Sequence, residues 1–325
     1  MAKAGFVADR GDAGRRLDLS IQRHLAGTHR LSRAATQRLI ADGHVAVNGR
    51  AVHRAAGRLA AGDVVAVDGA TSLPAPRRPE PEAAPIDVLY EDADLLVVVK
   101  PAGVTVHPTS AHRRGTLLNA LLGHASAARS TREWTPHLVQ RLDRDTSGLV
   151  LVAKSGAVHA ALQRAEDACV REYLAVVWGT PRPPSGTIDG RLGRDLLDRR
   201  RIAVREGGRS ALTAYECLDR SHGDRRGLSL VRCRLHTGRT HQIRVHLADR
   251  GWPIVGDAVY GRPARARLAD PALDRHARGF ARQALHAWRL SVAWPTPERV
   301  LRFEAPLPDD LAGLLGAAGL RLPRR

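Results

Sequence analysis

The chain has 325 residues, 43% of them hydrophobic, and carries 51 lysines and arginines against 33 acidic residues, for a formal net charge of +18. This length can bury a large core and suggests two domains, or one large domain with an appendage. Such an excess of positive charge attracts polyanions, so we expect nucleic acid as the partner. The amino terminus lacks the apolar core of a signal peptide, and no apolar run approaches the ~18 residues of a membrane span, so we expect a cytoplasmic protein without a membrane partner.

The three cysteines, Cys169, Cys217 and Cys233, are an odd number without CxxC spacing. They therefore indicate neither a disulfide framework nor a zinc site, and we expect no metal. Only three of the basic residues are lysines, so the arginine content can partly reflect the base composition of the genome. That alternative explains the choice of arginine over lysine and leaves the charge imbalance unexplained.

The first elements are expected within residues 14–68. Leu17, Ile21 and Leu25 recur at four-residue intervals, which is typical of an amphipathic helix. A second helix is expected over residues 32–43, because serine at its start is a good N-cap and glycine ends it. Residues 45–52 contain two β-favouring runs joined by Asn-Gly, the strongest short hairpin signal, and "GDVVAV" predicts one more strand.

This order of elements resembles the S4 RNA-binding domain over residues 14–68. The resemblance implies a small α/β domain that binds RNA, with Arg33, Arg38 and Arg50 among the residues that contact it. The alternative is a generic small domain with a solvated basic surface.

Residues 69–85 predict a linker. The stretch "GATSLPAPRRPEPEAAPI" contains five prolines together with alanine and charged residues, a composition that favours an extended, semi-rigid tether. It separates the small N-terminal unit from a large unit, which we place at residues 86–312.

The large unit alternates short apolar runs with polar turns, and six runs are predicted as strands: "DLLVVVKPAG", "GLVLVA", "YLAVVWG", "LSLVRCRL", "HQIRVHL" and "WRLSVAW". Helices are expected at residues 116–124 and 157–167. Because strands outnumber helices without regular βαβ alternation, we predict an α+β fold with a mixed, largely antiparallel central sheet and flanking helices. No glycine-rich phosphate loop is present.

The stretch "HLVQRLDRDTSGLVLVAKS" places Asp143 between Arg141 and Arg144, in a polar turn that leads into the apolar run at residues 148–153. Threonine, serine and glycine in this turn favour a rigid backbone. A carboxylate there is partly desolvated and stays ionised only if a cation or several donors meet it.

The cation is expected in "HTGRTHQIRVHLADRGWPIVGDAVYG". If "THQIRVHL" is a strand, Arg244 lies on the face opposite the core residues and should pair with a carboxylate. The segment "REYLAVVWGT" places Tyr173 on another strand, where its ring offers a flat surface for a base.

These segments together resemble the RluA family of pseudouridine synthases. The matching stretches include "QRLDRDTSGLVLVAK", "REYLAVVWG", "LHTGRTHQIRVHLA" and "GWPIVGDAVYG", and they run in order through residues 86–311. An S4 domain in front is common in the RluD-like branch, which modifies large-subunit ribosomal RNA. The resemblance therefore implies the pseudouridine synthase fold and isomerisation of uridines, in large-subunit (23S) ribosomal RNA, without a cofactor.

The resemblance also implies roles for individual residues. The catalytic aspartate falls on Asp143, the active-site tyrosine on Tyr173, and the arginine that pairs with the aspartate on Arg244. Arg141 corresponds to the arginine that enters the RNA stack where the uridine was, and we group Arg144 with it as an RNA-binding residue. One departure is Gln140, where the family usually has histidine.

Three alternatives stay open. The chain could be a catalytically silent RNA-binding or ribosome-assembly factor, although that predicts the loss of Asp143. It could be a glycoside hydrolase, which requires a second carboxylate opposite Asp143. It could also be a pseudouridine synthase directed at transfer RNA. We expect a monomer.

Overall fold

The computed structural model describes residues 4–25, 33–68, 79–109, 112–127, 134–165, 168–198, 201–221, 227–261 and 268–323. The chain divides into two compact units, Met1–Arg78 and Pro79–Arg325. Residues 69–78 of the predicted linker lie outside the described residues, as does Ser32, the predicted N-cap. None of the described helices is long and apolar enough to cross a membrane.

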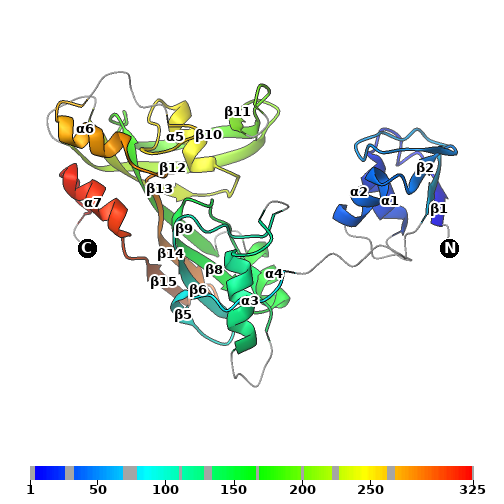
Figure 1. Ribbon diagram of the computed structural model, residues 1–325, viewed down its shortest axis with the longest axis horizontal. Helices are drawn as coiled ribbons and strands as arrows, with labels where there is room; N and C mark the ends of the chain where they lie inside the picture. Colours follow the sequence, from blue (N-terminus) through cyan, green and yellow to red (C-terminus); the bar gives the residue numbers. More distant parts are fainter. Residues whose placement is uncertain are drawn as a thin grey trace. The chain divides into compact units, whose positions relative to one another are not determined.

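The small unit packs two helices against an antiparallel sheet with strand order β1-β4-β2-β3 (Figure 1). Its described elements are β1 (Ala4–Val7), α1 (Leu17–Leu25), α2 (Arg33–Ala41), β2 (Val45–Val47), β3 (Arg50–Ala51) and β4 (Val64–Val67). The predicted helices, hairpin and closing strand are therefore present, and β1 is an element that the sequence did not predict.

The hairpin turn of the small unit has the geometry that its sequence requires. Asn48 and Gly49 have φ angles of 52° and 78°. Two consecutive positive φ angles are characteristic of a type I′ turn, which matches the twist of the flanking strands. The Asn48 side chain also donates to Asp63 Oδ1 at 2.9 Å, and this contact ties the turn to the start of β4.

The large unit is built on an 11-stranded sheet. In chain order its described strands are β5 (Asp87–Glu91), β6 (Leu95–Lys100), β7 (His137–Leu138), β8 (Ser147–Ala153), β9 (Cys169–Trp178), β10 (Ser185–Arg194), β11 (Ile202–Val204), β12 (Arg209–Arg220), β13 (Leu228–Leu235), β14 (Leu285–Ala293) and β15 (Val300–Glu304). The main path is β11-β10-β12-β13-β9-β14-β8-β6-β5, with β15 beside β14 and β7 beside β8.

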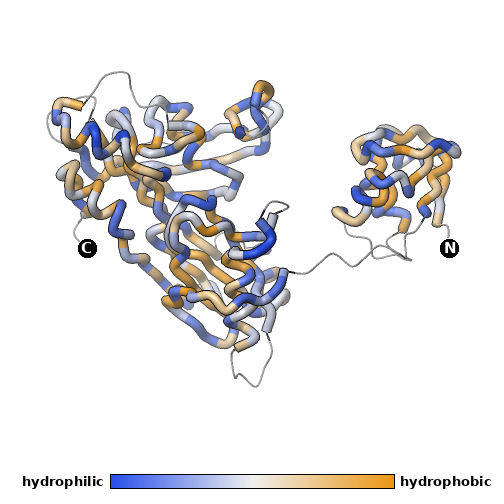
Figure 2. The backbone as a smooth tube through the Cα atoms, in the orientation of Figure 1, coloured by the Kyte–Doolittle hydropathy of each residue, from blue (hydrophilic) through white to orange (hydrophobic). Residues whose placement is uncertain are grey.

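The pairing in this sheet is mixed. Strands β14 and β8 run parallel, whereas the other described pairs of the large unit are antiparallel. The predicted class, α+β with a largely antiparallel central sheet, is confirmed. Hydrophobic segments follow the central strands (Figure 2), where every residue of β8 is buried.

The described helices of the large unit are α3 (Leu117–Ala127), α4 (Gly156–Arg164), α5 (Gln242–Asp249), α6 (Pro271–Arg278) and α7 (Asp309–Ala317). Figure 1 shows α3 and α4 near β5, β6 and β8, and α5 and α6 near the β10–β13 end of the sheet. The predicted helices at 116–124 and 157–167 correspond to α3 and α4, although residues 166 and 167 lie outside the described part.

The predicted strand "HQIRVHL" is wrong, because this segment forms helix α5. The alternation of polar and apolar residues suggested a strand with one polar face. In the structure the six residues from Gln242 to Leu247 are all buried, the polar ones against polar partners of the fold. A helix that is buried on all sides has no amphipathic period, so the alternation carried no information about its conformation.

The end of the predicted linker lies against the large unit. Asn119 of α3 donates from its side chain to Glu80 O at 2.7 Å and accepts from Glu82 N at its backbone oxygen at 2.9 Å. A Cβ atom on Gly123 would lie 2.0 Å from Glu82 O, so only glycine allows this approach. The large unit therefore begins before residue 86, and residues 79–85 are part of its surface.

Candidate active site

Asp143 lies in a turn that is fixed to strand β6 by a buried lysine. Lys100, at the end of β6, is buried and donates from Nζ to the carbonyl oxygens of Pro101, Val104 and Arg144 at 2.7, 2.9 and 2.9 Å. Burial lowers the pKa of Lys100 to about 8. One of these acceptors, Arg144 O, belongs to the residue directly after Asp143. The contact therefore fixes the backbone of the turn relative to the end of β6.

Strand β14 and the segment directly before it also contact this turn. Gln283 donates to Thr146 Oγ1 at 3.1 Å, and His286 Nδ1 lies 2.9 Å from Ser147 Oγ. Gly148 has a φ angle of +113°, and a Cβ atom there would lie 2.2 Å from Ala287 O. The rigid turn expected from the sequence thus depends on the close approach of β14 to the start of β8.

The predicted ion pair between Asp143 and Arg244 is present. Arg244 Nη1 donates to Asp143 Oδ2 at 2.9 Å, and the side chains are 7% and 18% exposed. Arg244 reaches the carboxylate from the first turn of α5 and not from a strand. The predicted contact is therefore present, but the predicted secondary structure of the residue that makes it is wrong.

Arg244 has a second partner that the sequence did not reveal. Its Nε and Nη2 atoms donate to the two carboxylate oxygens of Asp257 at 2.7 and 2.9 Å. Asp257 also accepts from the backbone N–H groups of Val259 and Tyr260. The bidentate pair fixes the plane of the guanidinium, so that its remaining edge points at Asp143.

The charges of this pair stabilise one another. Burial opposes the ionised form of Asp257, but hydrogen bonds and charge from Arg244 lower its pKa below the usual range. Burial likewise opposes the charge on Arg244, and Asp257 together with Asp143 raises its pKa. Asp257 belongs to "GWPIVGDAVYG", a motif visible in the sequence, but no spacing rule indicates that its partner lies 13 residues earlier.

Tyr260 supports the guanidinium from its face. The Arg244 guanidinium carbon lies 5.1 Å from the centre of the Tyr260 ring. The Tyr260 hydroxyl is 2.8 Å from His241 Nδ1, and His241 Nε2 is 3.8 Å from Asp143 Oδ2. Burial lowers the pKa of His241 despite the nearby carboxylate and so favours the neutral imidazole.

Tyr173 is in the wall of the same cavity as Asp143, on strand β9. Its side chain is buried, and burial raises its pKa to about 12, with a further contribution from the charge of Asp143. The hydroxyl therefore keeps its proton at neutral pH.

The cavity above Asp143 has a volume of about 860 Å³, within the range of roughly 300–1,000 Å³ that is typical of ligand sites. Asp143 is the one acidic residue among its described lining residues. The basic residues that line it are His107, Arg141, Arg171, Arg234, His236, Arg239, His241 and Arg244. Such a lining attracts a polyanion and presents a single carboxylate to it.

Arg141 and Gln140 both line this cavity, whereas Arg144 of the same turn is not among its described lining residues. Arg141 is exposed at its edge, and Gln140 donates to Leu149 O at 3.2 Å. Arg144 is 63% exposed and donates from Nε to Gly103 O at 3.1 Å.

The three predicted arginines of the small unit are all exposed. Arg38 lies on α2 and Arg50 on β3. Arg33 lies 3.5 Å from Asp18, which makes it part of an ion pair.

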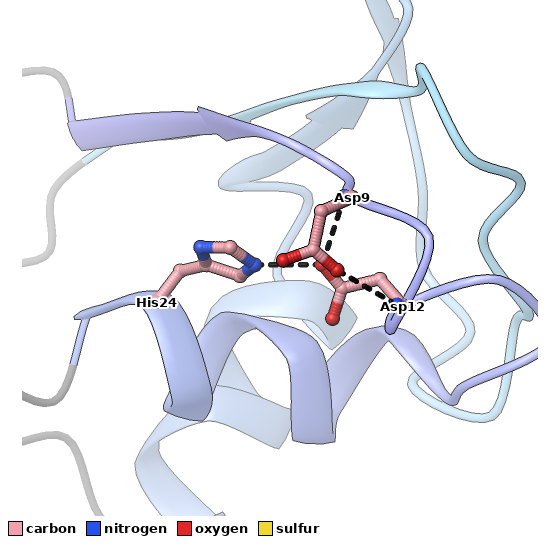
Figure 3. A group of neighbouring side chains, drawn as sticks. All are labelled: Asp9, Asp12 and His24. Carbon is pink, nitrogen blue, oxygen red and sulfur yellow. Dashed lines mark hydrogen bonds and ion pairs between the residues drawn. The ribbon is translucent and has the colours of Figure 1, made fainter.

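One group of described residues in the small unit has the composition of a metal site. Asp9, Asp12 and His24 place possible ligand atoms within 4.8 Å of one another (Figure 3). His24 Nε2 is 2.6 Å from Asp12 Oδ2, and Arg23 Nη1 donates to both carboxylates at 3.0 and 3.1 Å. Burial would raise the pKa of Asp12, but these contacts lower it. A cation is already present in the group, so the residues fit an ion-pair cluster better than a metal site.

Comparison with known proteins places the large unit in a family. Residues 94–249 match the family model described as RNA pseudouridylate synthase. The chain is 40% identical over 301 residues to "Uncharacterized RNA pseudouridine synthase YlyB" of Bacillus subtilis (strain 168), covering 91% of this chain and 92% of that one. It is 39% identical over 289 residues to "Ribosomal large subunit pseudouridine synthase D" of Zymomonas mobilis subsp. mobilis, covering 87% and 88%. Among solved structures, "Human RNA Pseudouridylate Synthase Domain Containing 1" matches with a TM-score of 0.55 and 26% identity, over 73% of this chain and 89% of that chain.

Proposed function

The chain belongs to the RNA pseudouridylate synthase family, and we propose that it isomerises uridines of large-subunit ribosomal RNA with Asp143 as the nucleophile. Its activity as a pseudouridine synthase, an isomerase that acts on RNA, follows from the family. The choice of RNA, the nucleophile and the way the uridine reaches it are the content of the proposal.

The observation that carries the proposal is the ion pair at the base of the cavity. Arg244 holds Asp143 at 2.9 Å and is itself held by Asp257. A carboxylate held by such a contact has a fixed orientation, which suits a nucleophile that must meet one carbon atom of a bound nucleoside.

A stacked uridine cannot present its glycosidic bond to Asp143, so it must first be flipped into the cavity, at a cost of a few kcal/mol. Arg141, exposed at the edge of the cavity, has the planar cation needed to fill the vacated position and to contact neighbouring bases or phosphates.

The reaction then needs groups of the protein and of the RNA, together with water for proton transfer. Asp143 attacks ribose C1′ or uracil C6, and the C1′–N1 bond breaks. The ring turns and forms a C1′–C5 bond, and the bond between Asp143 and C1′ or C6 breaks, which regenerates the free carboxylate. The C5 proton is lost and N1 gains one, so that substrate and product have the same atoms. No oxidant, reductant or external group takes part, and the proposal requires no cofactor.

Tyr173 contributes a flat ring and a protonated hydroxyl. With a pKa of about 12, it is a poor direct base for the C5 proton at neutral pH. We assign it the role of stacking on the uracil and of donating a hydrogen bond, and we assign removal of the C5 proton to a water molecule in the cavity.

The glycoside hydrolase alternative fails on the role of the second carboxylate. Asp257 is a carboxylate held by the same arginine as Asp143, but both of its oxygens accept from Arg244, and its side chain is fully buried. The two-carboxylate mechanism requires a second carboxylate that reaches the sugar from the side opposite Asp143. Asp257 has no such access. A catalytically silent factor would have no need of the contact by which Arg244 orients Asp143.

Ribosomal RNA is favoured over transfer RNA by the relatives, one of which is named for the ribosomal large subunit and matches 87% of this chain. The small unit, with its two helices and Asn-Gly hairpin in the order expected of an S4-like domain, is assigned RNA binding through Arg33, Arg38 and Arg50.

The test compares Asp143→Asn with Asp145→Asn, a matched variant two positions further along the same turn. Pseudouridine is mapped chemically in large-subunit ribosomal RNA and transfer RNA after incubation with each protein. Asp143→Asn should form none and bind RNA within about tenfold of the wild-type affinity, because Arg244 keeps its Asp257 partner. Asp145→Asn should remain active. Turnover by Asp143→Asn contradicts the nucleophile assignment, and modification of transfer RNA alone contradicts the substrate assignment.

A further inference from the structure

The hairpin formed by β10 and β11 ends in two exposed leucines. Leu197 is 99% exposed and Leu196 is 78% exposed, the highest values among the large hydrophobic residues that the structure describes. Single exposed leucines are common on protein surfaces. Two adjacent ones at the end of a hairpin form a small apolar patch, and its contact with water is unfavourable.

Hydrogen bonds fix the backbone of the segment that carries these leucines. Asp195 accepts from the backbone N–H groups of Leu197 and Asp198 at 2.8 and 3.2 Å. Across the hairpin, Asp195 N donates to Arg201 O at 3.0 Å, and Arg201 N donates to Asp198 O at 2.9 Å. These hydrogen bonds fix the backbone of residues 195–198, from which the two leucine side chains extend into solvent.

The charge around the leucines is strongly positive. From position 191 to position 209 the sequence has seven arginines and three acidic residues, a balance of +4. Of the three acids, Asp195 already accepts backbone hydrogen bonds within the turn. An apolar patch within an arginine-rich hairpin suits a ligand that has both negative charges and apolar faces. A nucleic acid offers its phosphates as the charges and its bases as the apolar faces.

The base of the hairpin is attached to the catalytic residues. Ile202 N donates to the Tyr260 hydroxyl at 2.9 Å, and the Arg201 guanidinium lies 5.3 Å from the centre of the Tyr260 ring. The same tyrosine contacts the Arg244 guanidinium with its ring and His241 with its hydroxyl at the candidate active site. The hairpin is thus held in a fixed position relative to Asp143, as Figure 1 shows by the place of β10 and β11 beside α5.

We propose that the end of the β10–β11 hairpin is an RNA-contact site in which Leu196 and Leu197 insert against unpaired or unstacked bases of the substrate while the arginines of the hairpin contact phosphates. The inference rests on the proposed function only in taking RNA as the substrate. Under this proposal the two leucines contribute a part of the RNA-binding free energy that does not depend on salt concentration, because the packing of leucine against a base is not electrostatic.

The experiment measures the dissociation constant of the full chain for a transcript of large-subunit ribosomal RNA, at low and at raised salt. Leu196→Ser/Leu197→Ser should weaken binding at least about fivefold, by the same factor at both salt concentrations, as expected when one apolar contact with a base is lost. Leu197→Trp should bind as tightly as the wild type or more tightly, because indole stacks on any base. The control Val88→Ser/Leu89→Ser changes an exposed pair on β5, at the other end of the sheet, and should leave binding unchanged.

Binding and turnover are read separately, so the two proposals can fail independently. Absence of pseudouridine formation by the wild type contradicts the proposed function and leaves the binding comparison valid. Unchanged affinity of the double serine variant overturns the role of the leucines. A wild-type dimer that the double serine variant converts to a monomer, with RNA affinity unchanged, also overturns it, because the apolar patch would then be a contact between copies of this chain.

Discussion

At the scale of single residues, the site is a chain of contacts that ends on one carboxylate. Asp257 orients Arg244, Tyr260 supports its face, and Arg244 orients Asp143. Each of these residues acts through the next, so their loss should change the rate of the reaction more than the binding of RNA.

Asp257→Asn should test this chain of contacts. The amide retains the shape of the side chain but cannot accept two charge-assisted hydrogen bonds, so Arg244 loses its fixed plane. We expect kcat to fall about 100-fold with little change in KM, as is typical of a small misplacement of a reacting group. Single-turnover kinetics measures this. Asp249→Asn, an exposed change on α5, the helix that carries Arg244, is the control, and equal activity of the two variants would contradict the positioning role.

His286 should make the stability of the protein depend on pH. Burial lowers the pKa of His286 from 6.5 to about 4. Between these values the unfolded state takes up a proton that the folded state does not, so the free energy of unfolding should drop by up to about 3 kcal/mol as pH falls from 6.5 to 4. His286→Asn preserves an acceptor or donor for Ser147 and does not titrate. Urea unfolding at several pH values should show a shallower acid loss for this variant, and an identical pH dependence would refute the assignment.

At the scale of elements, the active site depends on where two strands and a helix approach each other. Strand β14 runs parallel to β8 only near the start of β8, where Gly148 pairs with Ala287. Arg244 lies in the first turn of helix α5. The helix begins directly after His241, which has a left-handed backbone conformation with a φ angle of 57°. The turn that carries Asp143 therefore requires glycine at position 148, where β14 approaches most closely.

Gly148→Ala should displace β14 from the start of β8. The new Cβ atom would lie 2.2 Å from Ala287 O, and the φ angle of +113° is unfavourable for alanine. We expect a loss of about 2 kcal/mol or more in the free energy of unfolding, together with reduced activity. Gly316→Ala in α7, where a Cβ atom meets open space, should instead be neutral or slightly stabilising. Denaturant unfolding of both variants measures the difference, and similar stabilities would argue against the close approach.

At the scale of the whole molecule, two compact units share one strongly basic chain. The boundary lies at residue 78, because the residues from Pro79 onward belong to the large unit and contact α3. A truncation that respects the fold therefore removes residues 1–78 and leaves residues 79–85 in place.

Removal of residues 1–78 should leave the catalytic unit active on a minimal RNA stem-loop and weaken its affinity for longer RNA. If Arg33, Arg38 and Arg50 each neutralise a phosphate, the slope of log affinity against log salt should become shallower by about 2. Filter binding across a salt series, with pseudouridine formation assayed in parallel, provides both values. A folded but inactive truncated chain would contradict the modular organisation, and an unchanged slope would remove these arginines from the RNA interface.

Local chemistry made much of this protein predictable from sequence. The Asn-Gly turn, the helix of the small unit with Leu17, Ile21 and Leu25, and the apolar strand after Asp143 each follow from short-range periodicity or from the φ angles that particular residues allow. The expectation of a cation beside Asp143 also came from the sequence, since a partly buried carboxylate must be compensated.

Only the tertiary structure decided which groups meet. Arg244 is 101 residues from Asp143 and 13 from Asp257, and a pattern of neighbours along the chain contains no information about either contact. The segment around Arg244 looked like a strand and is a helix, because burial on all sides removed the periodicity that distinguishes the two. Periodicity and turn preference act over a few residues, whereas the partners of a buried charge are chosen by the packing of the whole unit.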